Sequence, residues 1–296
     1  MIFAFGGLIF ESYEEVYSMP LHLSSFVPKG QEDNAFRWIC QYGISEANMV
    51  IVSEDKKILL IRKRLKDART CRELGSIIYT LRSDDEVKAN EVLDIDIVLN
   101  NDDSCRVEFQ GLLEGSSDSN EYYHAATVPD DLHFELETVN RYAVSDHLLG
   151  TERDVSLSAF PFKVDVFDDI SAFNKHIGFG ESIRLGETEL MVGGLSDKFV
   201  GTGAASNPEK DPEEHYTFFL GTVESFEKGE IAFGDLIVNY TIVIVSSGLG
   251  RIPVIMNNEC FDLSRIHKEC VLAIYADIKA DLGCKEKWID LENDPE

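Results

Sequence analysis

The chain has 296 residues, of which 27 are Lys or Arg and 54 are Asp or Glu, so its formal net charge at pH 7 is −27. Because 44% of the residues are hydrophobic and 10% are aromatic, the composition excludes a disordered chain that cannot build a core. The length allows one large domain or two of medium size, which need no disulfide bonds to be stable.

The negative charge is spread over the whole chain. Residues 1–150 contain 14 basic and 27 acidic residues, and residues 151–296 contain 13 and 27. Such a field repels phosphate backbones and attracts basic surfaces, so we expect no nucleic-acid partner and favour a basic protein as partner. The alternative is that the acidic surface only keeps the protein in solution.

Cysteine usage and hydropathy predict a reduced, cytoplasmic protein. No two cysteines form a CxxC pair. The apolar N-terminus lacks the basic start of a signal peptide, and the longest uncharged stretch, Leu236–Gly250, is too short and too polar to cross a bilayer. We therefore expect no membrane segment. The six cysteines are Cys40, Cys71, Cys105, Cys260, Cys270 and Cys284.

The first elements read as a strand followed by helices. Residues 2–10 predict a buried strand, and Ser12 with Glu15 forms a capping box for a short helix that ends before Pro20. A second helix is expected over about residues 32–42, where apolar side chains recur at helical spacing.

A basic segment follows. Residues 48–52 and 57–61 flank a polar tetrad as in a hairpin, although a helix beginning at Ile58 is the alternative. The apolar spacing over residues 65–81 predicts a helix. The basic segment comprises Lys56, Lys57, Arg62, Lys63, Arg64, Lys66, Arg69 and Arg72. We expect carboxylates from residues 73–140 to neutralise it; an exposed patch would instead indicate an anionic ligand or partner, or a second copy of the chain.

The rest of the first half predicts strands and one helix. Strands are expected over residues 93–99, 105–113 and 122–128, which could form a meander. Asp130 then begins a predicted helix that runs to about Leu149, and Gly150 ends it. We place a domain boundary there, so residues 1–150 form the first domain and residues 151–296 the second.

The second half predicts mainly antiparallel strands. Residues 160–166 alternate in polarity, Asp168 or Asp169 begins a short helix, and residues 203–214 read as a loop. Three strands, a short helix and a strand follow, over residues 216–226, 236–245, 251–256, 263–268 and 271–278.

This order resembles the first four-fifths of an OB-type barrel, with a barrel-like core over about residues 215–282. Gly221 could bend its long first strand. The longer strand, Leu236–Val245, is apolar on both faces and is expected to be among the most buried elements. The predicted fold class is α+β, with an N-terminal mixed α/β unit followed by a mostly antiparallel β unit.

Two sets of side chains have the chemistry of metal ligands. Asp94 and Asp96 lie on one face of a predicted strand, where carboxylates can hold a hard cation. Cys260, His267 and Cys270, with Cys284 as a fourth ligand, suit zinc. The first set lacks a third ligand nearby and the second lacks paired ligand spacing, so we predict no metal and interpret the cysteines as structural thiols.

Other patterns are interpreted as structural. Ser246 and Ser247 precede a glycine without the G-x-S-x-G elbow, and the pairs Gly178-Phe-Gly180 and Gly201-Thr-Gly203 continue into no phosphate-binding motif. Aromatic side chains in 122–124 and 216–219 could stack on bases, but the acidic charge opposes this. No catalytic residue and no cofactor is predicted.

The sequence therefore favours a non-enzymatic binding protein, such as an inhibitor or immunity-type protein, whose acidic surface engages a basic macromolecule. The alternative is an enzyme of unrecognised family with a site between the two domains. The sequence does not determine the oligomeric state.

Overall fold

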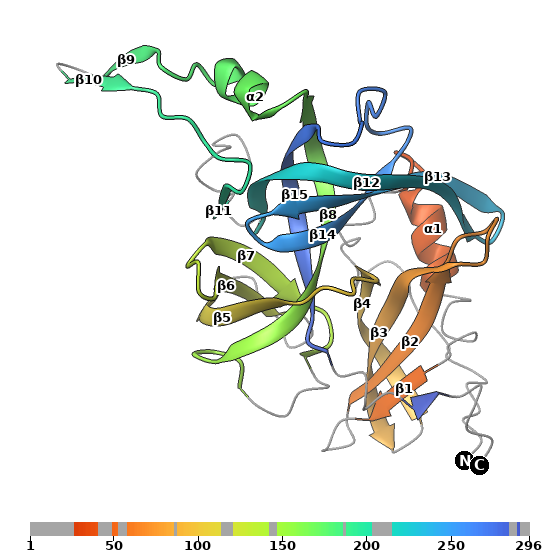
Figure 1. Cartoon of the computed structure of the whole chain (residues 1–296). Helices are drawn as coiled ribbons and strands as arrows, with labels where there is room; N and C mark the ends of the chain where they lie inside the picture. The colour runs from red at the N-terminus through yellow and green to blue at the C-terminus, as the bar shows by residue number, and fades with distance from the viewer. Residues whose placement is uncertain are drawn as a thin grey trace.

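The computed structural model describes residues 27–40, 49–52, 58–85, 88–113, 121–141, 147–185, 188–202, 215–283 and 289–290. Over these residues the chain is mostly β, with long strands and two short helices (Figure 1). The predicted α+β class is therefore corrected to a mostly β fold.

One sheet has five antiparallel strands in the order β16-β1-β2-β3-β4. A short helix, α1, lies beside it in Figure 1 and packs into the same core. The elements are α1 (Glu32–Trp38), β1 (Met49–Val52), β2 (Ile58–Lys66), β3 (Glu73–Asp85), β4 (Lys88–Leu99) and β16 (Ile289–Asp290).

The second sheet has nine strands in the order β11-β12-β13-β14-β8-β15-β7-β6-β5. These strands are β5 (Cys105–Leu112), β6 (Glu121–Thr127), β7 (His133–Thr138), β8 (Glu152–Phe167), β11 (Val200–Thr202), β12 (Thr217–Phe233), β13 (Leu236–Ser247), β14 (Gly250–Asn257) and β15 (Val271–Asp281). Between β8 and β11 lie α2 (Ile170–His176) and the hairpin of β9 (Ser182–Leu185) and β10 (Thr188–Met191), which extends away from the sheets in Figure 1.

Two additional pairings close this sheet into two rings that share the antiparallel pair β8–β15. One ring contains β5, β6, β7, β15 and β8, and the other contains β12, β13, β14, β8 and β15. Both rings have the same strand arrangement. In one, the consecutive antiparallel strands β5, β6 and β7 are followed by β8, which is antiparallel to β5, and β15 from the other ring pairs in parallel with β7. In the other, β12, β13 and β14 are followed by β15, which is antiparallel to β12, and β8 pairs in parallel with β14. Each ring therefore depends on the other for its fifth strand.

The barrel-like core expected over residues 215–282 is confirmed in its strand order, but its fifth strand, β8, precedes residue 215. Gly221 lies where β12 passes from β15 to β13. The segment predicted as helical at 263–268 forms turns instead, because the Asp262 carboxylate accepts hydrogen bonds from the amide and hydroxyl of Ser264.

Two predicted helices are wrong. Residues 65–81 contribute to β2 and β3, and β7 lies where a helix was expected from Asp130 to Leu149. In the first case the run Ile77-Ile-Tyr-Thr80 has β-branched and aromatic side chains that suit a pleated strand buried on both faces. In the second, Phe134 and Leu136 alternate toward the ring core.

The remaining predictions have mixed outcomes. The helix near residue 32, the hairpin of β1 and β2, the strands at 93–128 and the α2 start at Asp169 are confirmed. However, β4 belongs to a different sheet from β5 and β6, so these three strands do not form the predicted meander. The nine-stranded sheet continues across residue 150, where the division into two domains stays a prediction. The predictions for residues 2–20 and 203–214 lie outside the described residues.

Strand β13 connects two hydrophobic cores. Val238 and Tyr240 pack into the core between the five-stranded sheet, α1 and the β12–β13 hairpin, whereas Val243 and Val245 pack into the core of the rings. The predicted burial on both faces is therefore correct in the middle of the strand. It fails at the start, where Ile237 is 48% exposed because the ring core does not reach it.

The Asp67 carboxylate fixes the turn between β2 and β3 against the β12–β13 hairpin. Its Oδ1 accepts from the amides of Arg69 and Thr70 and from the Thr70 hydroxyl; its Oδ2 accepts from the Glu230 amide at 3.0 Å and the Tyr240 hydroxyl at 2.9 Å. A Cβ on Gly229 would lie 2.1 Å from that Oδ2, so only glycine leaves room for the contact.

We expect Asp67→Ala to lower the free energy of unfolding by about 3 kcal/mol, because buried donors including the Tyr240 hydroxyl lose their acceptor. Denaturant unfolding measures the change. Asp262→Ala is the matched control, since this carboxylate also closes a turn but is exposed, and it is expected to have little effect. Equal losses in the two variants would contradict the role assigned to Asp67.

Candidate functional site

A buried ionic cluster lies at the junction of the two sheets. The Lys279 ammonium donates to Asp96 Oδ1 at 3.0 Å and to Glu137 Oε2, and the Lys279, Asp96 and Glu137 side chains are only 2 to 3% exposed. Asp94 completes the group, with a carboxylate oxygen within 4.8 Å of those of Asp96 and Glu137. Three carboxyl groups therefore surround a single ammonium.

Strand geometry explains why these side chains meet. Ile95 and Ile97 of β4 face the core of the five-stranded sheet, so Asp94 and Asp96 face the other way. On β15, Ile278 and Ala280 fill the ring core, which turns Lys279 outward. Glu137 of β7 is the register partner of Lys279 in the parallel pair β7–β15.

Ionising all three carboxyl groups beside one ammonium would bury a net negative charge, which costs free energy. Burial raises the pKa of Asp96 well above its usual range, and the neighbouring Asp94 carboxylate raises it further. Burial also raises the pKa of Glu137 to about 7, although Lys279 opposes this. Burial alone would lower the pKa of Lys279, but the surrounding carboxylates outweigh it and raise that pKa. Lys279 therefore stays charged, and the carboxyl groups share protons.

This arrangement could hold a proton or a hard cation. Asp94 Oδ2 and Glu137 Oε1 are buried and accept no hydrogen bond from the protein. Three carboxylates at this spacing have the donor type that divalent cations prefer, but Lys279 already lies among them as a cation. The Asp94 and Asp96 carboxylates lie within 4.8 Å of each other, and burial raises the pKa of both. The geometry suits a structural link that also stores a proton.

Sequence analysis identified only half of this cluster. Asp94 and Asp96 lie on one face of a strand as predicted, and the third carboxylate, Glu137, comes from a segment predicted to be helical. Lys279 follows the predicted strand 271–278, and β15 continues past it. The available signal was a single lysine between apolar residues, Ile278 and Ala280, on a buried strand.

The cysteine set does not come together in the described part of the chain. Asp94, Asp96 and Glu137 form the one group of potential metal ligands found there. Cys270 is buried, and its sulfur accepts from the His267 amide at 3.5 Å, whereas Cys260 is exposed beside the Val27 carbonyl. Cys284 lies outside the described residues.

The serines and glycines of the motif-like patterns lie in turns and strands. The Ser247 hydroxyl closes the β13–β14 turn through the Leu249 amide, and Ser246 pairs with Arg251 in the ladder. Gly178 and Gly180 have positive φ in the turns after α2, and Gly201 lies in β11. Gly203 lies outside the described residues.

The side chains of the two aromatic segments, 122–124 and 216–219, pack mostly against rings from other parts of the chain. Tyr123 stacks edge-on against Phe109 in the ring core, and Phe219 is fully buried there. Tyr122 contacts the His215 ring at 5.2 Å between centroids, and His124 stacks on His133.

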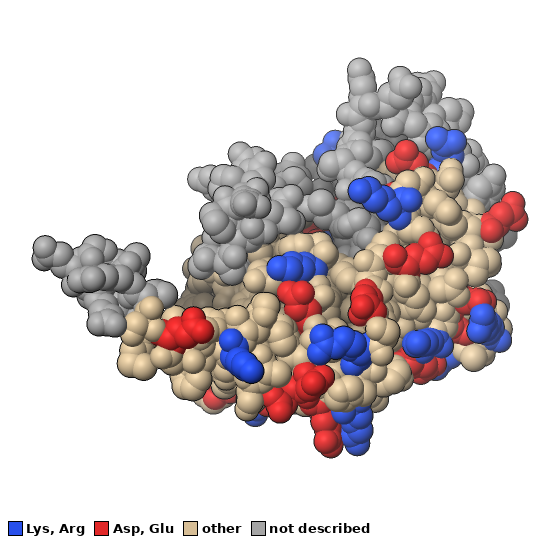
Figure 2. Space-filling model, turned by 90° about the horizontal axis from the view of Figure 1, so that it is seen from above, with Lys and Arg blue, Asp and Glu red and all other residues tan. Residues whose placement is uncertain are grey.

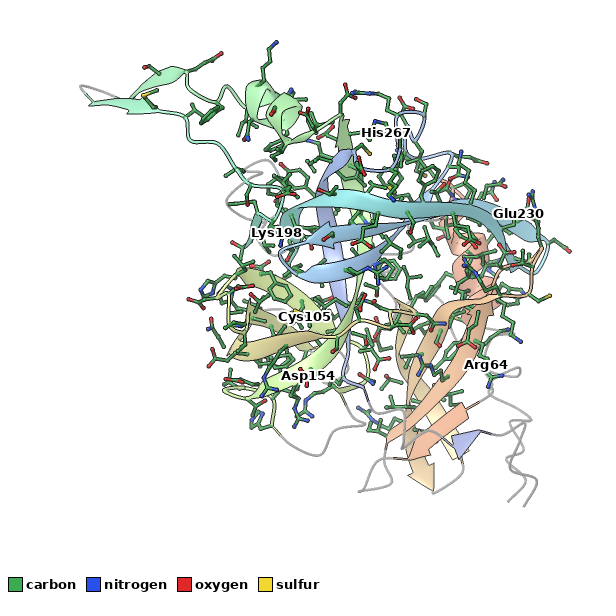
Figure 3. All side chains as sticks on the ribbon, viewed as in Figure 1. Arg64, Cys105, Asp154, Lys198, Glu230 and His267 are labelled. Atoms are coloured by element: carbon green, nitrogen blue, oxygen red, sulfur yellow. The ribbon has the colours of Figure 1, made fainter. Side chains whose placement is uncertain are left out.

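Four arginines of the basic segment have ion-pair partners among the described residues. Arg64 pairs, as expected, with a residue of 73–140, Glu73, at 3.6 Å. Because the long β12–β13 hairpin reaches over the β2–β3 turn, two further partners come from β12, and another comes from β15 (Figure 3). The other pairs are Arg62 with Asp281, Arg69 with Glu230 and Arg72 with Glu227.

We expect Lys279→Met to lower the free energy of unfolding by about 3 to 5 kcal/mol, because Asp96 and Glu137 would lose their buried cation. Lys163→Met is the matched control. Lys163 lies on the neighbouring strand β8, and its side chain is 57% exposed beside Asp165. Lys163→Met should therefore lower the free energy of unfolding by less than about 1 kcal/mol. A Lys279→Met protein as stable as the control would show that the cluster does not hold the sheets together.

Comparisons with known proteins do not assign a function to this site. No family model matches the sequence, and no curated protein matches it. Among solved structures, the chain is similar to the cytoplasmic molybdate-binding protein ModG in a molybdate-bound crystal form. The two are 13% identical, and the match covers 62% of this chain and 98% of ModG with a TM-score of 0.31, which is too low to carry an argument.

Neither described helix is long and apolar enough to cross a membrane.

Proposed function

We propose that the protein is a non-enzymatic binding protein, of the inhibitor or immunity type, whose acidic surface engages a basic macromolecule. The observation that carries this proposal is the excess of acidic side chains over any internal use for them. If each of the 27 basic residues neutralised one acidic residue, 27 of the 54 acidic residues would still be unbalanced.

The ion pairs of the described residues show that arginines are already used internally. Arg106 pairs with Glu152, Arg251 pairs with Asp103 and Glu224, and Arg141 pairs with Glu121. Among the described residues, the buried acidic side chains are only Asp67, Asp96 and Glu137. Most acidic side chains there are therefore in contact with water, where they are available to a basic partner.

The distribution of charged side chains on the surface favours long-range attraction of a basic partner over binding at a single acidic patch. On the face seen in Figure 2, acidic and basic side chains alternate over the described surface. A net charge of this size still creates a negative field that raises the association rate of a basic partner, and salt weakens this effect.

The test begins with a pull-down from lysate of the source cells at about 50 mM and about 150 mM NaCl, followed by association kinetics with the basic protein that is recovered. We expect Asp33→Asn, Asp102→Asn, Asp130→Asn and Glu259→Gln, combined in one variant, to lower the association rate constant several-fold at the lower salt. These side chains are exposed. The dissociation rate constant should change less.

Removal of positive charge is the matched control. Lys175→Gln with Lys198→Gln also removes exposed charges and should raise the association rate constant slightly. Recovery of no basic protein at either salt, or equal rate constants for all variants, would contradict the proposal.

One observation favours the alternative of an enzyme. The Asp94, Asp96, Glu137 and Lys279 cluster lies between the two sheets, and its carboxyl groups have raised pKa values, as general acids and bases often do. The same burial opposes it, because a catalytic group must contact its substrate and Glu137 and Lys279 are each 2% exposed. The binding function therefore remains our proposal.

A further inference from the structure

Two histidines lie side by side on the outer face of the antiparallel pair β6–β7. Because Tyr123 of β6 and Phe134 of β7 face the ring core, the neighbouring His124 and His133 face away from it. His124 Nε2 lies 3.1 Å from His133 Nδ1, and the two ring planes differ by 14°. These two nitrogens share one hydrogen bond, so the second nitrogen of each ring is left for a different partner.

Asp131 lies beside the second nitrogen of His133. Its Oδ1 is 3.4 Å from His133 Nε2, which favours a proton on Nε2 and leaves the lone pair on Nδ1, the atom that faces His124. A carboxylate beside the far nitrogen of a histidine is the arrangement that orients imidazole ligands toward a metal ion in proteins. Asp131 therefore prepares Nδ1 of His133 as a ligand.

The distance between the two facing nitrogens suits a shared metal ion. Zinc binds imidazole nitrogen at about 2.0 to 2.1 Å with tetrahedral geometry, so two such nitrogens on one ion are about 3.3 Å apart. His124 Nε2 and His133 Nδ1 therefore need to separate by only about 0.2 Å. The strand ladder fixes the two backbones, and the His133 side chain is 47% exposed, which leaves room for its ring to turn toward the ion.

The charge around the pair favours a cation. Glu135 is the register partner of His124 and lies on the same face, and Asp131 lies on the other side of His133. The net charge of −27 also attracts cations from a distance. Burial and the charge of His133 lower the pKa of His124, so its ring is neutral at about pH 7 and can bind a metal.

We propose that His124 and His133 bind a zinc ion, or a similar divalent transition-metal ion that prefers imidazole, through Nε2 and Nδ1. The ion takes the place of the proton between these nitrogens. His124 loses this Nε2 proton to solvent and takes up one at Nδ1, so both rings stay neutral, and water completes the coordination. The site does not rest on the proposed function, and it differs from the carboxylate cluster, where Lys279 already supplies the cation.

Calorimetry of the full chain with zinc chloride and magnesium chloride at about pH 7.5 tests the proposal. We expect one zinc ion to bind per chain and magnesium not to bind there, because magnesium prefers oxygen ligands. His133→Gln should weaken zinc binding about tenfold or more, since one of the two ligands is lost. Asp131→Asn should weaken it several-fold through the orientation of His133.

His267→Gln is the matched control. His267 is also exposed, and it lies beside Cys270 in the set of side chains that the sequence offers for zinc. This variant should bind zinc as the wild type does.

The pH dependence gives a second readout of histidine ligands. Zinc affinity should fall between about pH 7.5 and about pH 5.5, because protons compete for ring nitrogens near the ordinary histidine pKa of 6.5.

Modification with diethyl pyrocarbonate locates the bound ion without any substitution. Zinc should slow the modification of His124 and His133 and leave that of His176, an exposed histidine after β8, unaffected. Mass spectrometry measures each residue. If His133→Gln has a lowered melting temperature, this protection experiment decides.

Four results would overturn the proposal. They are the absence of zinc binding, magnesium binding as tight as that of zinc, zinc binding that His267→Gln weakens and His133→Gln does not, and modification of His124 and His133 at the same rate with and without zinc.

Discussion

The buried contact of Lys279 with Asp96 and Glu137 joins the two halves of the structure. Asp96 belongs to the five-stranded sheet, Glu137 to one ring, and Lys279 to β15, which both rings share. Removing one partner would leave a charge buried without compensation, so the position of the sheets depends on all three. Because both rings contain the pair β8–β15, fixing β15 against the five-stranded sheet also fixes both rings relative to that sheet.

The use of positive charge inside the molecule connects the fold to the proposed function. Arg62 of β2 and Arg69 and Arg72 of the β2–β3 turn pair with carboxylates that lie far away in the sequence, on β15 and β12. Each of these pairs contains one arginine and one carboxylate, so the chain keeps its net charge of −27, which supports a basic partner.

The sequence predicted well those elements that local pattern determines. The alternation at Phe160–Val166, the apolar strand Leu236–Val245 and the cap at Asp169 led to correct elements. It failed at residues 65–81 and 130–149, where apolar spacing also fitted a helix and only packing on both faces decides for a strand. The candidate site was half predicted, because Asp94 and Asp96 are neighbours in sequence, whereas Glu137 and Lys279 reach them through pairing between distant strands.

The pH dependence of stability tests the central claim, that buried carboxyl groups share protons around Lys279. Burial raises the pKa of Glu137 from its ordinary value of 4.5 to about 7, so the folded state binds this proton more tightly than the unfolded state. The stabilisation is present below about pH 4.5 and is lost as the pH rises to about 7. Relative to Glu137→Gln, the wild-type free energy of unfolding should therefore fall across this range. A difference between the two proteins that stays constant with pH would contradict the account.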